Sequence, residues 1–371
     1  MPANTHELPT AQLITRPDGA MENGEAGRGQ IAFRQQTFPI AGASEVTVRF
    51  LMAPVHPLDT LVIGGRYPVK PIYQYSGEDI LGYDGVAEVL AVGNQVNDLH
   101  TGDLVVPSKF GLGTWRTHAV FQACELQRVS RVKDLRFAAI LRVSVMPAYF
   151  LVEDMAILRP GEYILQNAGT SVVAQMVIQF AHRRGLKTIS VIRDRDQANA
   201  IMIQTALHQL GADMVVTEND LLHNSASILK NKKVTLALDS VFGPPGRALV
   251  QALGVGGTYV QLGFLGSSQE ALELDAGDMF GRQLSLRAFR GSAQLALRSL
   301  AHQQALCDWL TQLFNEGQIL MPPLGFTEVH WDGKSAAHEV LEVIKRAQRG
   351  EVGLRKPMII FETQDDSIDN M

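Results

Sequence analysis

The stretch Gln166–Gln175, with the sequence QNAGTSVVAQ, decides the fold. It follows the apolar run EYILQN (162–167) and opens a helical pattern, in which apolar residues recur at positions 173, 176, 177, 180 and 181. A dinucleotide-binding turn usually carries three glycines here, whereas this stretch carries one, Gly169. Taken alone, it fits a phosphate-binding turn and an ordinary strand–helix connection about equally well.

Strand-like runs alternate with helical patterns on the C-terminal side of this stretch. The apolar runs 187–193, 234–243 and 256–266 predict strands, and a second helical pattern ends near Leu210. Such alternation is typical of right-handed βαβ units and a parallel sheet. The sequence therefore predicts an α/β fold.

The parts of the chain on either side of this region have a different sequence pattern. Short strand-like runs at 46–52, 86–93, 103–107 and 117–121 are separated by Gly, Pro and Asp, which favours a β-rich barrel or sandwich. Near the C-terminus, amphipathic helices are predicted to end near Gly317 and Gly350, followed by a strand at 356–361.

Length and composition narrow the function. At 371 residues the chain predicts two domains, and a net charge of −5 without a basic stripe argues against nucleic acid or an anionic membrane as partner. The two cysteines, Cys124 and Cys307, offer neither a disulfide framework nor a cysteine-rich zinc site. No apolar run is long enough to span a bilayer.

Residues 1–30 are polar and lack signal or transit patterns, so we expect a flexible leader and a cytoplasmic protein.

The end of the strand after the opening stretch indicates the cofactor. An NAD-type site places an acid there to bind the ribose 2′-hydroxyl, but here the sequence is VIRDRD, in which Arg193 and Arg195 bracket Asp194. Two guanidinium groups suit the 2′-phosphate of NADP by charge and by bidentate geometry. The alternative is a pair of solvated charges on a loop. Turn and arginines together favour a cofactor site.

Five segments resemble one family: VHPLDTLVIGG (55–65), GRYPVKP (65–71), GLGTWRTHAVF (111–121), QNAGTS (166–171) and VIRDRD (191–196). Over about residues 31–361 the chain resembles the mitochondrial-type 2-enoyl thioester reductases, which belong to the zinc-independent medium-chain dehydrogenases/reductases. The resemblance implies a GroES-like catalytic domain plus a doubly wound, Rossmann-type domain. The expected boundaries are a leader at 1–30, the first part of the catalytic domain at 31–150, the Rossmann domain at 151–300, and a return to the catalytic domain at 301–371.

The resemblance also implies chemistry. NADPH would reduce the α,β double bond of an enoyl thioester on CoA or an acyl carrier protein, in a homodimer without metal. Tyr67 would be the proton donor to the α-carbon. The implied cofactor contacts are Ser144, Thr170, Ser171, Val172, Val173, Arg193, Asp194, Arg195, Leu262, Gly263, Phe264, Leu265, Phe289, Arg290, Gly291 and Lys356.

Several positions leave alternatives open. Ser144-Val145 replaces the family's Asn-Pro, Leu81–Gly85 (LGYDG) replaces its GGNEG, and Ala174 replaces its second turn glycine. Trp115 is predicted to bind substrate, with filling of the barrel core as the alternative. Lys356 either reaches a cofactor phosphate or caps the last strand.

Two other functions remain possible from the sequence. One is an NADPH-dependent quinone or enone reductase of the same superfamily, and the other is a nucleotide-binding protein without efficient turnover. The ten histidines show no HxxxH or HExxH spacing, so His118 is expected to pack rather than to bind a metal.

Overall fold

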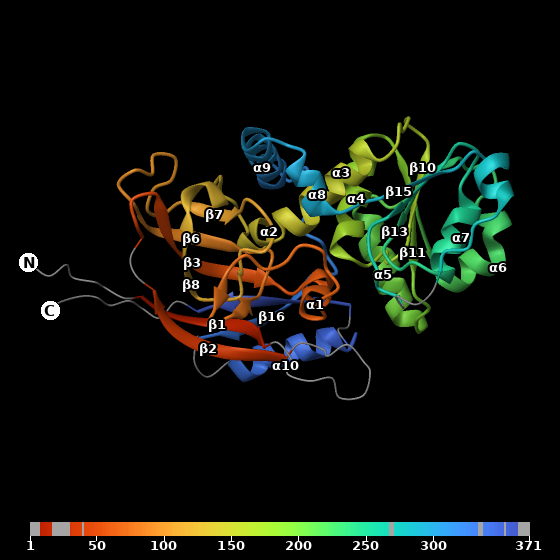
Figure 1. Ribbon diagram of the computed structural model, residues 1–371. Coiled ribbons are helices and arrows are strands. Elements are labelled where there is room, and N and C mark those ends of the chain that lie inside the picture. The colour runs from red at the N-terminus through yellow and green to blue at the C-terminus, as the bar shows by residue number, and fades with distance from the viewer. Residues whose placement is uncertain are drawn as a thin grey trace, which may run out of the picture. The chain divides into compact units, whose positions relative to one another are not determined.

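The computed structural model describes residues 8–16, 30–38, 41–266, 271–332, 337–351 and 354–362. The chain forms two compact units (Figure 1). The first contains the described parts of 1–143, 298–318 and 326–371, and the second contains Ser144–Leu297 and Ile319–Gly325. The first unit is therefore assembled from both ends of the chain.

Two sheets form the first unit. The larger has seven strands, six of them in the order β16-β17-β3-β6-β7-β9, while β8 pairs with β3. Its strands are β3 (Glu45–Pro54), β6 (Val86–Val92), β7 (Leu104–Pro107), β8 (His118–Gln122), β9 (Leu126–Val129), β16 (Phe326–Trp331) and β17 (Lys356–Phe361). The smaller sheet has the order β2-β1-β5-β4, from β1 (Leu8–Arg16), β2 (Gln30–Phe38), β4 (Gln74–Tyr75) and β5 (Glu78–Ile80).

Strand β3 holds this unit together. It pairs antiparallel with β6, β8 and β17, so the C-terminal strand lies beside a strand that begins at Glu45. Its alternate residues Val46, Val48 and Phe50 are buried in the core with Trp115 and Trp331. Period-two burial of this kind is what an apolar/polar alternation predicts.

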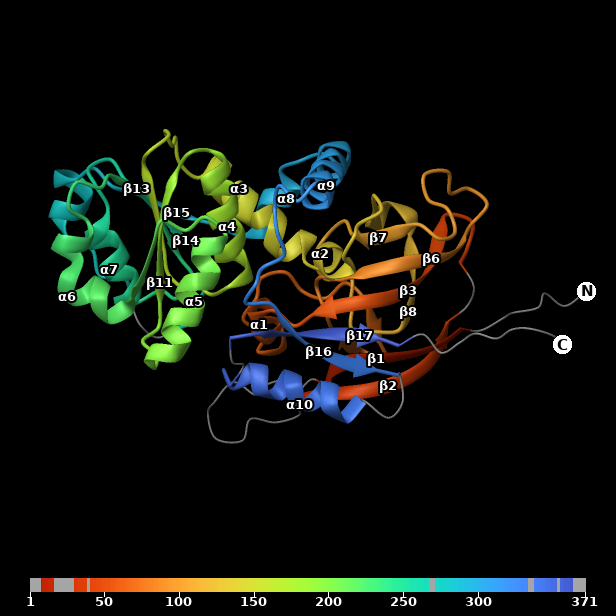
Figure 2. The same ribbon diagram turned by 180° about the vertical axis from the view of Figure 1, so that it is seen from behind.

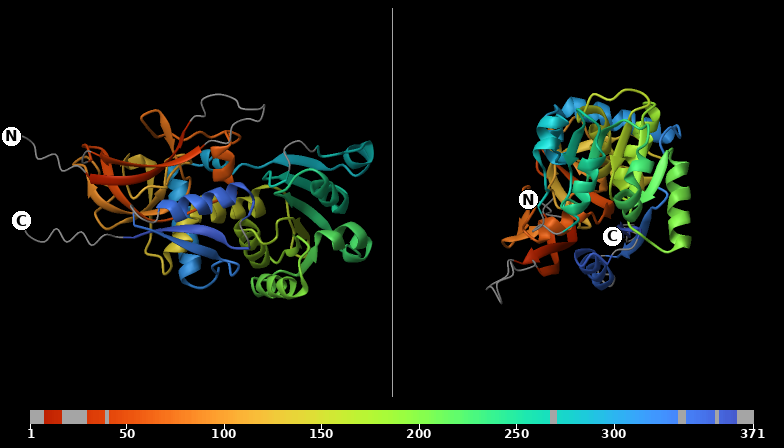
Figure 3. Two further views of the ribbon diagram at one scale, coloured as in Figure 1. Left: turned by 90° about the horizontal axis from the view of Figure 1, so that it is seen from below. Right: turned by 90° about the vertical axis from the view of Figure 1, so that its right-hand side faces the viewer.

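Helices complete the first unit. They are α1 (Pro57–Ile63), the 3₁₀ turn η1 (Ala123–Glu125), α2 (Leu135–Ala139), α9 (Leu300–Asn315) and α10 (Ala337–Gln348). Figures 2 and 3 show α10 lying along β16 and β17, where it buries Val340 and Ile344. This agrees with the amphipathic pattern of its sequence.

The prediction of a flexible leader over 1–30 is wrong for residues 8–16. They form β1, which pairs over its whole length with β2 and at Ile14 and Thr15 with β5. Leu13 and Ile14 are fully buried, the Leu13 N–H donates to the Trp115 carbonyl oxygen, and the Leu13 carbonyl oxygen accepts from the Leu81 N–H. Burial of these two side chains fixes the strand. Residues 1–7 and 17–29 lie outside the described residues.

The second unit contains a six-stranded parallel sheet in the order β12-β11-β10-β13-β14-β15. The strands are β10 (Tyr163–Gln166), β11 (Lys187–Ile192), β12 (Met214–Thr217), β13 (Val234–Asp239), β14 (Thr258–Gln261) and β15 (Ser285–Ala288). In chain order this is 3-2-1-4-5-6, the arrangement of a doubly wound Rossmann sheet. The strand order reverses between β10 and β13, which is where such sheets bind ligands at their carboxyl ends.

Helices cover both faces of this sheet. They are α3 (Met146–Asp154), α4 (Val172–Arg183), α5 (Gln197–Gln209), α6 (Glu218–Ile228), α7 (Pro244–Ala252) and α8 (Gly291–Ala296), with π-helical turns η2 (Leu141–Val145) and η3 (Gly277–Gly281). Figure 2 views the sheet nearly edge-on, with α4 and α5 on one face and α6 and α7 on the other. The α/β prediction is confirmed.

Candidate active site

The turn between β10 and α4 has the geometry of a phosphate cradle. Ser171 is the N-cap of α4, and its hydroxyl oxygen accepts a hydrogen bond from the Ala174 N–H at 3.1 Å. The N–H groups of Val172 and Val173 stand in the first turn, where a helix offers no acceptor of its own. The positive end of the helix dipole therefore points out of the turn, as anion binding requires.

Gly169 lets the turn approach β11. A Cβ atom at this position would lie 3.0 Å from the Val191 carbonyl oxygen and 3.1 Å from the Ser190 Cβ. The Gly169 N–H donates to that same carbonyl at 2.9 Å. One glycine is thus required here for close packing. The neighbouring Ala168 adopts a positive φ of 48°, so the turn bends without a second glycine.

A buried network that the sequence did not reveal joins the ends of β10 and β13 to Tyr259 of β14. The Asn167 side chain donates to the Asp239 carboxylate at 2.6 Å and accepts from the Ser240 N–H at 2.7 Å. Asp239 also accepts a short hydrogen bond from the hydroxyl of Tyr259. Burial, and then Asp239, raise the pKa of Tyr259, so the phenol stays protonated as donor. The sequence feature that could have indicated this network is Asp239, a polar residue at the end of the apolar strand VTLALD.

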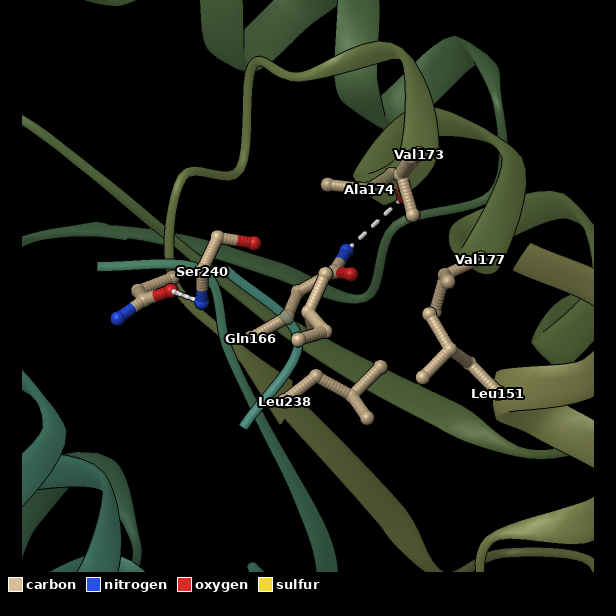
Figure 4. A pocket seen from close by; sticks show the side chains of 9 residues that line it. Leu151, Gln166, Val173, Ala174, Val177, Leu238 and Ser240 are labelled. Carbon is tan, nitrogen blue, oxygen red and sulfur yellow. Dashed lines mark hydrogen bonds between the residues drawn. The ribbon is translucent and has the colours of Figure 1, made fainter. Parts of the chain in front are cut away.

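A small hollow lies at the switch point. Its space of about 180 Å³ includes open solvent, and side chains from the ends of β10, β13 and β14 and from α3 and α4 line it. Figure 4 shows the Gln166 amide reaching the Ala174 carbonyl oxygen, a hydrogen bond of 3.0 Å that ties β10 to α4. Leu151, Val173, Val177 and Leu238 make the lining largely apolar, and Ser240 and Asn167 add polar groups.

Arg193 and Arg195 follow β11 at the carboxyl edge of the sheet. Both are exposed, and within the described part of the chain neither makes an ion pair or a side-chain hydrogen bond. Because β11 pairs in parallel with β10, these residues follow the strand beside the Gly169 turn. Asp194 is occupied differently, because its carboxylate accepts from the Asn219 N–H of α6 at 3.3 Å.

The remaining predicted cofactor contacts of this unit fall at the same edge. Gly263 follows β14, and a Cβ atom there would lie 2.8 Å from the Ser240 carbonyl oxygen, so the loops after β13 and β14 touch through a glycine. The exposed Phe264 packs edge-on against Phe242, with ring centroids 5.9 Å apart. Other predicted positions that follow β14 and β15 are Leu262, Leu265, Phe289, Arg290 and Gly291.

Ser144, in η2, has an unpaired buried hydroxyl. Its side chain is 1% exposed, and its Oγ finds no hydrogen-bond partner among the described residues. An orphaned buried hydroxyl is costly unless a ligand satisfies it. This observation fits a bound cofactor.

Tyr67 lies in the first unit, in the loop that follows α1. Gly65, at a φ of 68°, ends the helix, and the N–H groups of Arg66 and Tyr67 both donate to the Leu61 carbonyl oxygen. The Tyr67 ring is half-buried and meets the ring of Tyr83 edge-on, with centroids 6.1 Å apart. The loop therefore holds a defined conformation.

A cluster of buried titratable groups also belongs to the first unit. His56 and Asp84 are each no more than 3% exposed, with His56 Nε2 and Asp84 Oδ2 3.4 Å apart. Burial raises the pKa of Asp84 and, with Lys356, lowers the pKa of His56. Burial also raises the pKa of Asp59 to about 7 and lowers that of Lys356 to about 8. Lys356 begins β17 beside these groups, and its contact with a cofactor remains a prediction.

The prediction that Trp115 binds substrate is wrong in this structure. The side chain is 0% exposed, packs in the core, and donates from its indole N–H to the Pro54 carbonyl oxygen at 3.2 Å. The alternative reading of Trp115 as a barrel core residue is correct. An apolar ring with one satisfied donor is ordinary core chemistry.

Within the described ranges, His, Cys, Asp and Glu side chains form no group of three or more that could hold a metal ion. No helix in the described part of the chain is long and apolar enough to cross a membrane.

Comparisons with known proteins place this geometry in a family. Residues 42–153 match the alcohol dehydrogenase GroES-like domain. The chain is 37% identical over 281 residues to the mitochondrial enoyl-acyl-carrier-protein reductase of Rattus norvegicus, covering 75% of this chain and 73% of the relative. The chain belongs to the enoyl-acyl-carrier-protein reductase family. The family resemblance expected from the sequence is thereby confirmed.

Three further matches are one curated relative and two solved structures that share the fold. An NADPH quinone oxidoreductase of Kluyveromyces marxianus is 30% identical over 324 residues, 82% of this chain and 83% of that protein. The Etr1p/Etr2p heterodimer of the mitochondrial 2-enoyl thioester reductase from Candida tropicalis has the same fold, with a TM-score of 0.80, 23% identity and coverage of 95% of this chain and 100% of that chain. Etr1p has also been solved as a complex with NADP and crotonyl-CoA, with a TM-score of 0.81, 23% identity and the same coverage.

Proposed function

We propose that the chain is an NADPH-dependent enoyl-thioester reductase. The observation that carries the proposal is its 37% identity to a mitochondrial enoyl-acyl-carrier-protein reductase over 75% of the chain. Reduction saturates the α,β double bond: a hydride goes to the β-carbon and a proton to the α-carbon. CoA or acyl carrier protein carries the acyl group.

The second unit supplies the cofactor contacts. The amides at the start of α4 would bind the pyrophosphate, and the exposed guanidinium groups of Arg193 and Arg195 would bind the 2′-phosphate. The orphaned Ser144 hydroxyl completes a hydrogen bond with the cofactor. NADPH, when bound, supplies the hydride.

Tyr67 supplies the proton. Hydride addition leaves negative charge on the α-carbon and the thioester oxygen, and a phenol in the Tyr67 loop can donate to this enolate. A tyrosine in water titrates near pH 10, so a phenol remains a donor at neutral pH. The proton on the phenolate is then restored from solvent.

A second candidate is a quinone reductase. The 30% identity to the quinone oxidoreductase of Kluyveromyces marxianus over 82% of the chain favours it. Both activities consume NADPH, so they differ in the acceptor. Homodimerisation and a cytoplasmic location also belong to the proposal, although the enoyl reductase relative is named mitochondrial.

NADPH oxidation by the purified protein tests the proposal. We expect consumption with crotonyl-CoA and little with a 1,2-quinone or with neither acceptor. Turnover of the quinone alone would favour the second candidate. Tight NADPH binding without turnover of either acceptor would instead indicate a nucleotide-binding protein.

Tyr67→Phe tests the proton donor. The change keeps the ring and removes the hydroxyl, so we expect single-turnover reduction of crotonyl-CoA to fall by about 10²–10⁴-fold. NADPH affinity, measured by fluorescence titration, should stay unchanged. If the variant reduces crotonyl-CoA at the unmodified rate, the donor is a different group.

A further inference from the structure

A buried tyrosine, Tyr83, contacts the loop that contains Tyr67. Tyr83 is 0% exposed, and its hydroxyl donates to the Val69 carbonyl oxygen at 2.7 Å. Val69 stands two residues after Tyr67, in the same loop. The ring of Tyr83 also meets the ring of Tyr67 at an interplanar angle of 86°, with centroids 6.1 Å apart. One side chain therefore contacts the loop at two points.

Tyr83 is itself held rigidly. Its ring packs edge-on against Phe110, with centroids 6.2 Å apart. The preceding Gly82, at a φ of 96°, lies so close to the next segment that a Cβ atom would come within 2.5 Å of the Thr114 hydroxyl. The Gly82 carbonyl oxygen also accepts from the Thr114 N–H at 3.1 Å. The backbone next to Tyr83 is therefore fixed against the segment that contains Thr114.

Two backbone attachments of the loop lie near its ends. At its start, the Leu61 carbonyl oxygen accepts from Arg66 and Tyr67, and at its end Ile72 donates to the Gly111 carbonyl oxygen at 2.7 Å. Tyr83 contacts the stretch between these two attachments. Such a contact controls where the Tyr67 ring can point.

We propose that Tyr83 is the positioning residue that orients the Tyr67 hydroxyl for proton delivery. The inference rests on the proposed function, because it requires Tyr67 to be the donor. Small displacements of a reacting group are expensive, since about 1 Å can change a rate by about 10²-fold. A hydroxyl anchored to the backbone of the donor's own loop limits such displacement.

Tyr83→Phe isolates the anchor, because it keeps both ring contacts and removes the hydrogen bond to Val69. We expect kcat for crotonyl-CoA to fall by about three- to tenfold, the range of one lost neutral hydrogen bond. The KM for crotonyl-CoA and the dissociation constant for NADPH should change by less than about twofold, since neither ligand loses a contact.

The decisive measurement is the same substitution in the Tyr67→Phe background. If Tyr83 acts through the Tyr67 hydroxyl, Tyr83→Phe has no further effect once that hydroxyl is gone. An equal loss in both backgrounds would mean that Tyr83 acts by general stability, and would overturn the inference. So would an unchanged kcat in Tyr83→Phe alone.

Two further variants serve as controls for this measurement. Tyr73→Phe also removes a tyrosine hydroxyl bond in this unit, the one to Glu125, and should leave kcat unchanged. Phe110→Leu removes the ring–ring contact with Tyr83. It should lower kcat when Tyr67 is present and have no further effect in the Tyr67→Phe variant. Full activity of Tyr67→Phe would refute the donor assignment itself, whereas a slow Tyr67→Phe with additive Tyr83→Phe refutes the positioning role alone.

Discussion

Arg193 and Arg195 are the residues to which the most specific role is assigned, binding of the cofactor's 2′-phosphate. They are exposed and, within the described residues, unpaired, so they are available to a dianionic phosphate. A charge-assisted hydrogen bond at such a site contributes about 1–3 kcal/mol. Replacing both by alanine should raise the KM for NADPH by about one to two orders of magnitude and leave NADH little changed.

Arg159→Ala is the matched control for this pair. Arg159 is exposed and precedes β10, at the opposite edge of the same sheet. It should leave both Michaelis constants unchanged. Equal use of NADPH and NADH by the unmodified protein would contradict the assignment.

Asp59 gives a second residue-scale prediction, about pH. Burial raises its pKa from 3.8 to about 7, so between these values the folded state binds more protons than the unfolded state. The free energy of unfolding then falls as pH rises through this range, by up to about 4 kcal/mol from this group. Asp59→Asn keeps an acceptor for the His56 N–H and removes the titration.

Urea unfolding of the two proteins across this pH range measures the effect. The stability of Asp59→Asn relative to the unmodified protein should increase from pH 4 to pH 7, as expected from the raised pKa. Asp84 and Lys356 titrate in both proteins, and so does His56, whose lowered pKa has the opposite effect on the slope. A stability difference that does not change with pH would refute the raised pKa of Asp59.

At the scale of elements, the turn from β10 to α4 shows what one glycine does. A methyl group on Gly169 would press against the Val191 carbonyl oxygen, which is backbone and cannot rotate away. We expect Gly169→Ala to push the start of α4 off β11 and to weaken NADPH binding by about fivefold to tenfold, as about 1 kcal/mol does. Gly281→Ala, with open space around its Cβ position, should bind normally.

The elements that the sequence predicted correctly are those with local signals. Strands β10, β11, β13 and β14 and helices α4 and α5 follow from apolar periods, and the position of Arg193 follows from the end of β11. Strand β1 was missed because its polar surroundings hide a burial that depends on β2, β5 and Trp115, far along the chain. Trp115 was misassigned for the same reason, since the sequence does not show which neighbours cover a ring.

At the scale of the whole molecule, the edge strand β15 stands out. Within the described part of the chain it pairs on one side only, with β14, and all four of its residues are exposed. Leu286 is 38% exposed, and the preceding η3 leaves Met279 46% and Phe280 90% exposed. An unpaired edge with apolar side chains beside it is suited to pairing with a second copy.

We therefore expect a homodimer that joins two sheets edge to edge through β15. Light scattering with size-exclusion chromatography should give the mass of two chains. The double variant Phe280→Lys, Leu286→Lys should be monomeric and still folded, because exposed positions tolerate charge with changes of about 0.5 kcal/mol or less. Ile201→Lys, on α5, is 55% exposed and should stay dimeric. A dimer that survives the double variant would place the interface on another face.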